Sequence, residues 1–102
     1  MAFGQDLACL YKGTDFQGPK FCFSPGQQPP DLNMFPLSDG SASNGMFGSI
    51  EIRGTATIII YDQTQYQSTV QPLLITYSVS DLSTIWNTVI NSIDVEYPQP
   101  QQ

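Results

Sequence analysis

Residues 11–18, YKGTDFQG, carry a spacing of aromatic rings and glycine that returns later in the chain. Residues 61–68, YDQTQYQS, repeat both rings at an offset of fifty residues, with Ser68 in the place of Gly18. A second echo, at an offset of forty-three, relates residues 44–52 to residues 87–95. The sequence therefore predicts an internal duplication of one structural unit, with about seven extra residues in the first copy.

A chain of 102 residues is the size of one domain, and a unit of half that length would be marginally stable alone. We therefore expect the two copies to share one core, for which the hydrophobic share of 40% is sufficient. The predicted domain spans residues 1–97, with the first copy at about 5–54 and the second at about 55–97. Residues 98–102, PQPQQ, have nothing to bury and are predicted to form a disordered tail.

The charge of the chain excludes several classes of partner. The net charge is −6, and Lys12, Lys20 and Arg53 are the only cations. Three scattered cations cannot displace the counterions of a nucleic acid or hold an anionic membrane surface. No apolar run approaches the ~20 residues of a membrane span, and the start of the chain lacks the features of a signal peptide. We expect a cytoplasmic protein and leave secretion of a processed form open. Self-association is compatible with the sequence, and the sequence does not identify a specific partner.

Hydrophobic patterning predicts short strands and almost no helix. Gly13 and Gly18 are expected to supply the positive φ angles of the first folded hairpin. The long connection in each copy, mostly loop at residues 27–43, suggests four strands per copy in the Greek-key layout. The predicted architecture is all-β, with two Greek keys forming a β-sandwich of about eight strands. The clearest predicted elements are strands at 6–11, 20–23, 48–53, 55–61, 70–77 and 91–96, and one helical turn at 81–86.

These motifs resemble the βγ-crystallin family, whose Greek keys carry ring, four residues, ring, one residue and glycine, followed by a serine near the last strand. The resemblance runs from about Leu7 to Glu96 and extends to the slime-mould and fungal single-domain members of the family. It implies a βγ-crystallin-like β-sandwich. We expect the matching residues to be structural, like the single Trp86. They are Tyr11, Phe16, Gly18 and Ser49 in the first key and Tyr61, Tyr66 and Ser92 in the second, where Ser68 departs from the glycine.

The same resemblance raises calcium binding. Many microbial members bind calcium through a segment of two Asn or Asp residues, two other residues, Ser or Thr, and Ser, and each site draws ligands from both copies. Both segments here depart from that pattern and contain no carboxylate, although calcium needs several oxygen ligands. We therefore predict no cofactor, with weak calcium binding as the alternative. The degenerate positions are Asn44, Gly45 and Gly48 in the first copy and Asn87, Thr88 and Asn91 in the second.

Enzymatic and zinc sites find little support. The chain has no histidine, which excludes Ser-His-Asp and Cys-His arrangements, and two cysteines are too few for a structural zinc site. Asp15 and Asp62, one in each motif turn, are the one carboxylate pair considered for acid–base work. Solvated turn acids are the simpler interpretation. Cys9 and Cys22 flank the first hairpin, where a bridge is geometrically conceivable, but two reduced thiols are expected in an intracellular protein.

The leading hypothesis from the sequence is a non-enzymatic protein of a microbial cell, with a fungus as the suggested source. Its expected role is structural or associated with stress or development. One alternative is a calcium-binding module stabilised by the ion. The other is a secreted binding protein or toxin of the same fold, marked by an oxidised Cys9–Cys22 pair and an exposed apolar patch around Met34, Phe35 and Met46.

Overall fold

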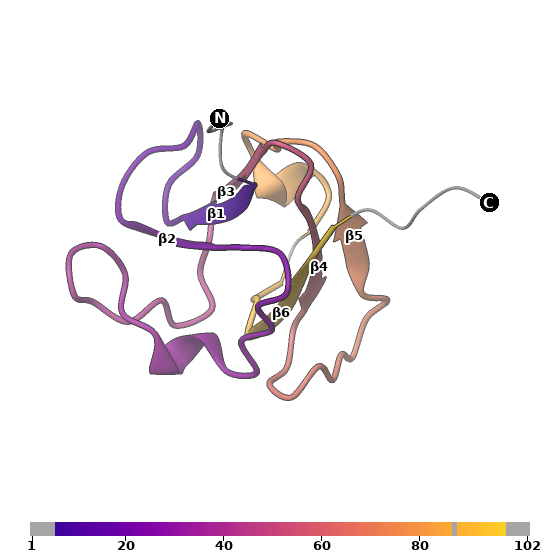
Figure 1. The fold of residues 1–102 in the computed structure, drawn as a ribbon. Helices are drawn as coiled ribbons and strands as arrows, with labels where there is room; N and C mark the ends of the chain where they lie inside the picture. Colours follow the sequence, from indigo (N-terminus) through magenta and orange to yellow (C-terminus); the bar gives the residue numbers. More distant parts are fainter. Residues whose placement is uncertain (1–5, 87, 98–102) are drawn as a thin grey trace.

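A computed structural model describes residues 6–86 and 88–97 (Figure 1). Two antiparallel three-stranded sheets make up the fold, which confirms the predicted all-β class. Sheet A has the order β2-β1-β3, from β1 (Leu7–Tyr11), β2 (Lys20–Phe23) and β3 (Ser49–Arg53). Sheet B has the order β5-β4-β6, from β4 (Thr57–Tyr61), β5 (Leu73–Ile75) and β6 (Ser92–Glu96). The predicted tail at 98–102 and the candidate residue Asn87 lie outside the described residues.

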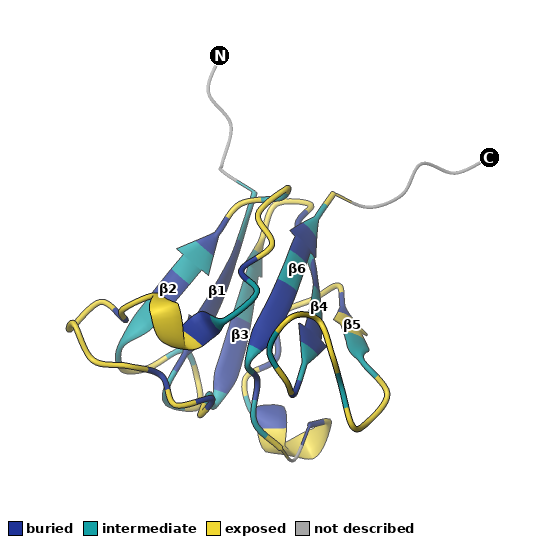
Figure 2. Ribbon diagram, turned by 90° about the horizontal axis from the view of Figure 1, so that it is seen from below, coloured by how far each residue is buried: buried dark blue, intermediate teal, exposed yellow. Residues whose placement is uncertain are grey.

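The core lies between the two sheets, whose buried faces meet in Figure 2. Alternation along the strands selects the inward side chains. On β4, Ile58 and Ile60 are fully buried, whereas Ile59 between them is half-buried on the outer face. Leu10 on β1 and Ile93 on β6 complete the same cluster from the two sheets. Trp86, 8% exposed, belongs to this cluster, as expected for a core residue.

The described residues form six strands and not the eight predicted, because the segment before the last strand of each copy crosses to the opposite sheet without forming a full strand. In the first copy, residues 26–29 run beside β6, where the Val95 amide donates to the Gln27 carbonyl at 3.0 Å. Pro29 and Pro30 interrupt this ladder because proline has no amide hydrogen to donate. In the second copy, Val79 forms a single antiparallel bridge with Ile50 of β3. Each sheet is therefore completed by the other copy.

The strand predicted at 70–77 needs correction, because it is limited to β5 at the edge of sheet B, where Pro72 precedes it. The segment 27–43, predicted as mostly loop, contains one 3₁₀ turn, η1 (Leu32–Met34). The helical turn predicted at 81–86 is present as η2 (Leu82–Thr84). Asp31 and Asp81 cap these turns through the amides of Asn33 and Ser83. Within residues 6–86 and 88–97 we find no helix long and apolar enough to cross a membrane.

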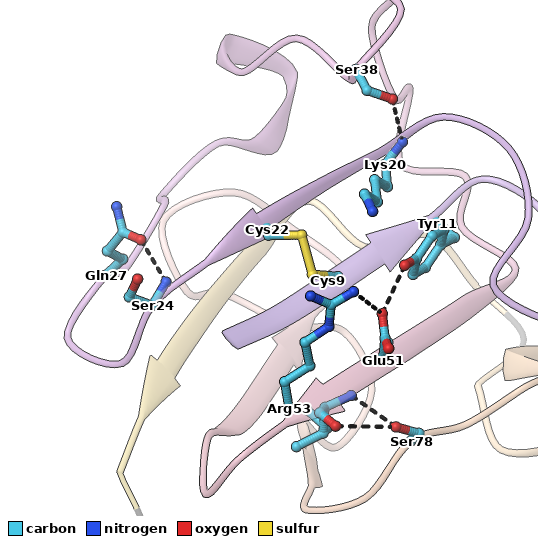
Figure 3. Close-up of a disulfide and its surroundings, with 11 residues drawn as sticks. Cys9, Tyr11, Lys20, Cys22, Ser24, Gln27, Ser38, Glu51, Arg53 and Ser78 are labelled. Atoms are coloured by element: carbon cyan, nitrogen blue, oxygen red, sulfur yellow. Dashed lines mark hydrogen bonds and ion pairs between the residues drawn. A yellow bond between two sulfur atoms is a disulfide. The ribbon is translucent and has the colours of Figure 1, made fainter. Parts of the chain in front are cut away.

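Cys9 and Cys22 form a disulfide, contrary to the two reduced thiols expected (Figure 3). The two residues face each other directly in the register between β1 and β2. Directly opposed residues of antiparallel strands bring their Cβ atoms close enough for a bridge, which the sequence separation alone does not reveal. The bridge lies on the outer face of sheet A, since Ala8 and Leu10 on either side of Cys9 belong to the core.

Beside the disulfide, a polar cluster covers the outer face of sheet A (Figure 3). The Tyr11 hydroxyl donates to the Glu51 carboxylate at 2.7 Å, and the Arg53 guanidinium donates to the same oxygen at 3.3 Å. The Tyr11 hydrogen bond is the main cause that lowers the pKa of Glu51. Sheet B carries Asp94 where sheet A has Glu51, and a hydrogen bond with Asp94 raises the pKa of Glu96. The outer faces of the two copies therefore differ in charge although their backbones correspond.

Candidate functional site

The two repeated turns are built in the same way. The rings of Tyr11 and Phe16 pack edge to face with centroids 5.9 Å apart, and the rings of Tyr61 and Tyr66 do so at 5.8 Å. Edge-to-face packing is a favoured geometry for aromatic pairs, so each pair covers its turn. The residues predicted from the motif thus lie together in each copy.

A buried serine fastens each turn to the last strand of its copy. The Ser49 hydroxyl donates to the Gly13 carbonyl at 2.6 Å and accepts from the Phe16 amide at 3.0 Å. Ser92 repeats both bonds with the Gln63 carbonyl and the Tyr66 amide, at 2.6 and 3.1 Å. The hydroxyls satisfy backbone groups that the tight turns leave without partners.

The turns contain positive φ angles at non-glycine residues, for which the sequence predicted none. Positive φ angles occur at Asp15 and Phe16 in the first turn and at Gln65 and Tyr66 in the second. Gly18 has a φ of +87°, as predicted, but Gly13 does not have a positive φ. Instead, a Cβ at Gly13 would lie 2.9 Å from the Gln17 carbonyl oxygen. Glycine is needed at position 13 for space and at position 18 for conformation.

Ser68 changes the way in which the second turn ends. The Asp62 carboxylate accepts from the Ser68 hydroxyl at 3.1 Å, from the Thr69 amide at 2.8 Å and from the Thr69 hydroxyl. The hydrogen bond from the Thr69 side chain is the main cause that lowers the pKa of Asp62. Asp62 is only 3% exposed and its carboxylate is occupied, whereas Asp15 is exposed in the other turn. This arrangement gives no support to an acid–base pair of Asp15 and Asp62.

The structure brings the two degenerate calcium segments together in a crossed manner. Gly48, the fifth position of the first segment, and Thr88, the second position of the second, line one cavity. Gly45 and Asn91 form the reciprocal pair, since a Cβ at Gly45 would lie 3.3 Å from the Asn91 Oδ1 atom. This geometry accords with the implication that each site draws on both copies.

Neighbouring atoms occupy the space that ligand side chains would need at both glycines. A Cβ at Gly45 would lie 2.8 Å from the Val89 Cβ atom, and a Cβ at Gly48 would lie 2.6 Å from the Gly13 carbonyl carbon. Real Cβ atoms essentially never approach so closely, so an Asp or Asn at position 45, or a Ser or Thr at position 48, requires the backbone or side chains to shift. The glycines at these positions are packing residues.

Asn91 serves as a structural bridge. Its side-chain Nδ2 atom donates to the Asp62 backbone carbonyl at 2.9 Å, and its Oδ1 atom accepts from the Asn33 side chain at 3.3 Å. The Asn33 Oδ1 atom in turn accepts from the Asn44 amide at 3.1 Å. The oxygens of Asn91 and Asn33 are therefore already engaged with protein groups. Among the described residues, no group of three or more acidic, histidine or cysteine side chains is placed to hold a metal ion.

The residue that sequence reasoning missed near this site is Asp81. Asp81 lines the same cavity as Gly48 and Thr88, together with the hydroxyl-bearing Ser83. Asp81 lies six residues before the second segment, so a search for carboxylates within the motif did not find it. The repeated Asp-Leu pair at 31–32 and 81–82 was visible in the sequence, but only the folded chain brings Asp81 to the cavity.

Comparison with known proteins agrees with this architecture. No family model and no curated protein matches the sequence. Among solved structures, a βγ-crystallin domain from Flavobacterium johnsoniae superposes with a TM-score of 0.73 at 20% identity, covering 92% of this chain and 98% of that one. The βγ-crystallin domain of the abundant perithecial protein from Neurospora crassa, solved in the Ca²⁺-bound form, gives 0.71 at 17% identity and covers 99% of both chains.

A third solved structure, a βγ-crystallin domain from Clostridium beijerinckii, gives a TM-score of 0.68 at 13% identity, covering 87% of this chain and 95% of that one. The three superpositions extend over nearly the whole of each partner chain. The superposed part of this chain therefore includes both copies. The chain has the βγ-crystallin domain fold.

Proposed function

We propose that this protein is a non-enzymatic structural protein, associated with stress or development, whose calcium segments have become packing elements. The observation that carries the proposal is the space around Gly45 and Gly48, which Val89 and the Gly13 backbone fill. A calcium cage needs six to eight oxygens, and the first segment has no side-chain oxygen at either glycine. The absence of histidine and the occupied carboxylate of Asp62 support a role without catalysis.

Thermal unfolding with calcium and with a chelator tests this proposal. A ligand that binds only the native state must raise the melting temperature. We expect melting curves in 5 mM calcium chloride and in 5 mM EDTA to coincide. This calcium concentration is about five-thousandfold above the dissociation constant of a micromolar site. An upward shift of several degrees in calcium, with magnesium chloride as the ionic-strength control, would contradict the proposal.

A calcium-binding module is the second candidate, and one observation favours it. Asp81 supplies a carboxylate to the cavity that Gly48 and Thr88 line, and Ser83 adds a hydroxyl. Calorimetric titration of the protein with calcium distinguishes the two candidates, because heat that saturates at micromolar concentrations requires a formed site. Mass measurement in solution with and without calcium tests self-association in the same samples.

A secreted binding protein is the third candidate, favoured by the Cys9–Cys22 disulfide. Disulfides persist mainly in oxidising compartments, so the bridge weighs against the cytoplasmic location expected from the sequence. Met34 and Met46 are 76% and 58% exposed, and Phe35 is 36% exposed, as an apolar contact surface requires. Counting free thiols in protein taken from its native cells under denaturing conditions, with alkylation during lysis, decides this point: zero thiols supports secretion and two supports the cytoplasm.

A further inference from the structure

A cavity of about 600 Å³ lies between the first motif turn and η2. Its volume falls within the range of about 300 to 1,000 Å³ that is typical of small-molecule sites. One wall is apolar and consists of Met46, Phe47, Trp86 and Val89. Trp86 belongs to the core and Phe47 packs against it, whereas Met46 is exposed.

The apolar wall is aromatic and free of competing polar groups. The Trp86 indole N–H donates to the Val89 carbonyl at 3.0 Å, so the polar atom of the ring is satisfied within the protein. Trp86 and Phe47 therefore offer ring surface alone. Met46 is 58% exposed at this wall, where a flexible thioether side chain adapts to a bound apolar group.

Asp81 brings one negative charge to the described lining of the cavity. The Asp81 Oδ1 atom accepts from the Ser83 amide at 3.1 Å and from the Ser83 hydroxyl at 2.6 Å, which fixes the carboxylate at the start of η2. The second carboxylate oxygen makes no hydrogen bond to any of the described residues. The described lining of the cavity contains no lysine or arginine, and the chain as a whole has a net charge of −6.

We propose that this cavity binds a small organic cation, that is, an ammonium group carried on a compact aromatic or apolar body. The carboxylate and the net charge repel anions. Met46, Phe47, Trp86 and Val89 offer no side-chain oxygen to a calcium ion, which needs several oxygen ligands. An ammonium group pairs with Asp81 and is attracted to the aromatic faces, while its apolar body covers Met46, Phe47 and Trp86.

Tryptophan fluorescence tests the proposal directly, because Trp86 is the only tryptophan of the chain and lies in the cavity wall. The probe is 2-phenylethylammonium, compared with neutral 2-phenylethanol and anionic 3-phenylpropanoate, which have similar apolar bodies. We expect a saturable change with the ammonium, affinity about fivefold weaker for the alcohol, and no saturable change with the anion. A factor of five corresponds to the upper value of a partly exposed ion pair, about 1 kcal/mol.

Asp81→Asn removes the charge and keeps a good capping residue for η2. Asp31→Asn is the matched control, since Asp31 caps η1 in the same way and does not line the cavity. We expect Asp81→Asn to bind the ammonium and the alcohol equally, and Asp31→Asn to bind as the wild type. Melting curves first establish that both variants fold. If Asp81→Asn does not fold, Asp81→Ser takes its place, because serine also caps η2 and carries no charge. Equal response to all three probes, no response to any, or equal weakening by both variants overturns the proposal.

Discussion

Ser49 and Ser92 are small side chains that each tie a turn to the sheet behind it. Both are fully buried, and each hydroxyl bonds one carbonyl and one amide of its turn. A buried backbone group that loses its partner costs about 1–3 kcal/mol. These two residues therefore contribute more to stability than their size suggests.

We expect Ser49→Ala and Ser92→Ala each to lower the free energy of unfolding by about 1–3 kcal/mol. In each variant, one backbone carbonyl and one backbone amide of the corresponding turn lose their hydrogen-bond partner. Urea unfolding at neutral pH measures the change. Ser41→Ala is the control, because the Ser41 side chain is exposed and bonds only to Asp39, at 2.6 Å. A cost for Ser92→Ala near zero would show that the two turns are not energetically equivalent.

Asp62 makes part of the stability depend on pH. Its hydrogen bonds hold its pKa in the folded state below the ordinary value of 3.8. The stabilisation is therefore complete above that value and is lost as the pH falls through the lower pKa of the folded state. We expect the difference in unfolding free energy between wild type and Asp62→Asn to be constant near neutral pH and to shrink below pH 3.8. Unfolding curves in a pH series test this, and a difference that grows in acid would contradict it.

At the scale of elements, the two copies differ in the cross-strand pair on the outer face of their first hairpin, β1–β2 in sheet A and β4–β5 in sheet B. Cys9 faces Cys22 in sheet A, and Ile59, fifty residues after Cys9, faces Leu74 in sheet B. A covalent bridge thus occupies the place of an apolar cross-strand pair. The bridge also closes a loop that contains the whole first turn, because the two cysteines are 13 residues apart.

We expect reduction of the disulfide, or the double substitution Cys9→Ala and Cys22→Ala, to lower the free energy of unfolding by about 2–4 kcal/mol, as a loop of ~15 residues predicts. Urea unfolding with and without dithiothreitol gives the value. The double variant should not respond to the reductant, which serves as the control. Cys9→Ile with Cys22→Leu, which reproduces the Ile59 and Leu74 pair of sheet B, should recover part of the loss.

For the whole molecule, the crossed segments make each copy depend on the other. The Gln65 amide donates to the Pro30 carbonyl and the Asp15 amide donates to the Ser80 carbonyl, both at 2.8 Å. The Leu32 amide likewise donates to the Asn91 carbonyl, and the Leu82 amide to the Gly48 carbonyl, at 2.9 and 2.8 Å. These reciprocal pairs are backbone bonds, so they are independent of the side chains that differ between the copies.

We expect the separate fragments 1–54 and 55–102 to be unfolded, because each loses the segment that completes its sheet and half of the common core. Mixed in equal amounts, they should regain β structure. Circular dichroism and the dispersion of amide resonances report both states. A fragment that folds alone would show that the copies are independent domains, and fragment 55–102 is the sharper test because it lacks the disulfide.

Local spacing in the chain was enough to predict the all-β class and the residues that pair in both turns. Rings at a fixed spacing, with a serine near the last strand, form contacts largely within one copy, and such contacts can be read from order along the chain. The strands at Lys20–Phe23 and Thr57–Tyr61 followed in the same way from their alternation and β-branched content.

The number of strands, the disulfide and the cavity depended on contacts between residues far apart in the sequence. Residues 26–29 and Val79 lie in the sheet of the other copy, and no local pattern specifies which sheet completes their hydrogen bonds. Asp81 lines one cavity with Thr14, Gly48 and Thr88 only when both copies are packed together. Register across strands and space around a glycine are properties of packing, and packing is fixed by the whole chain at once.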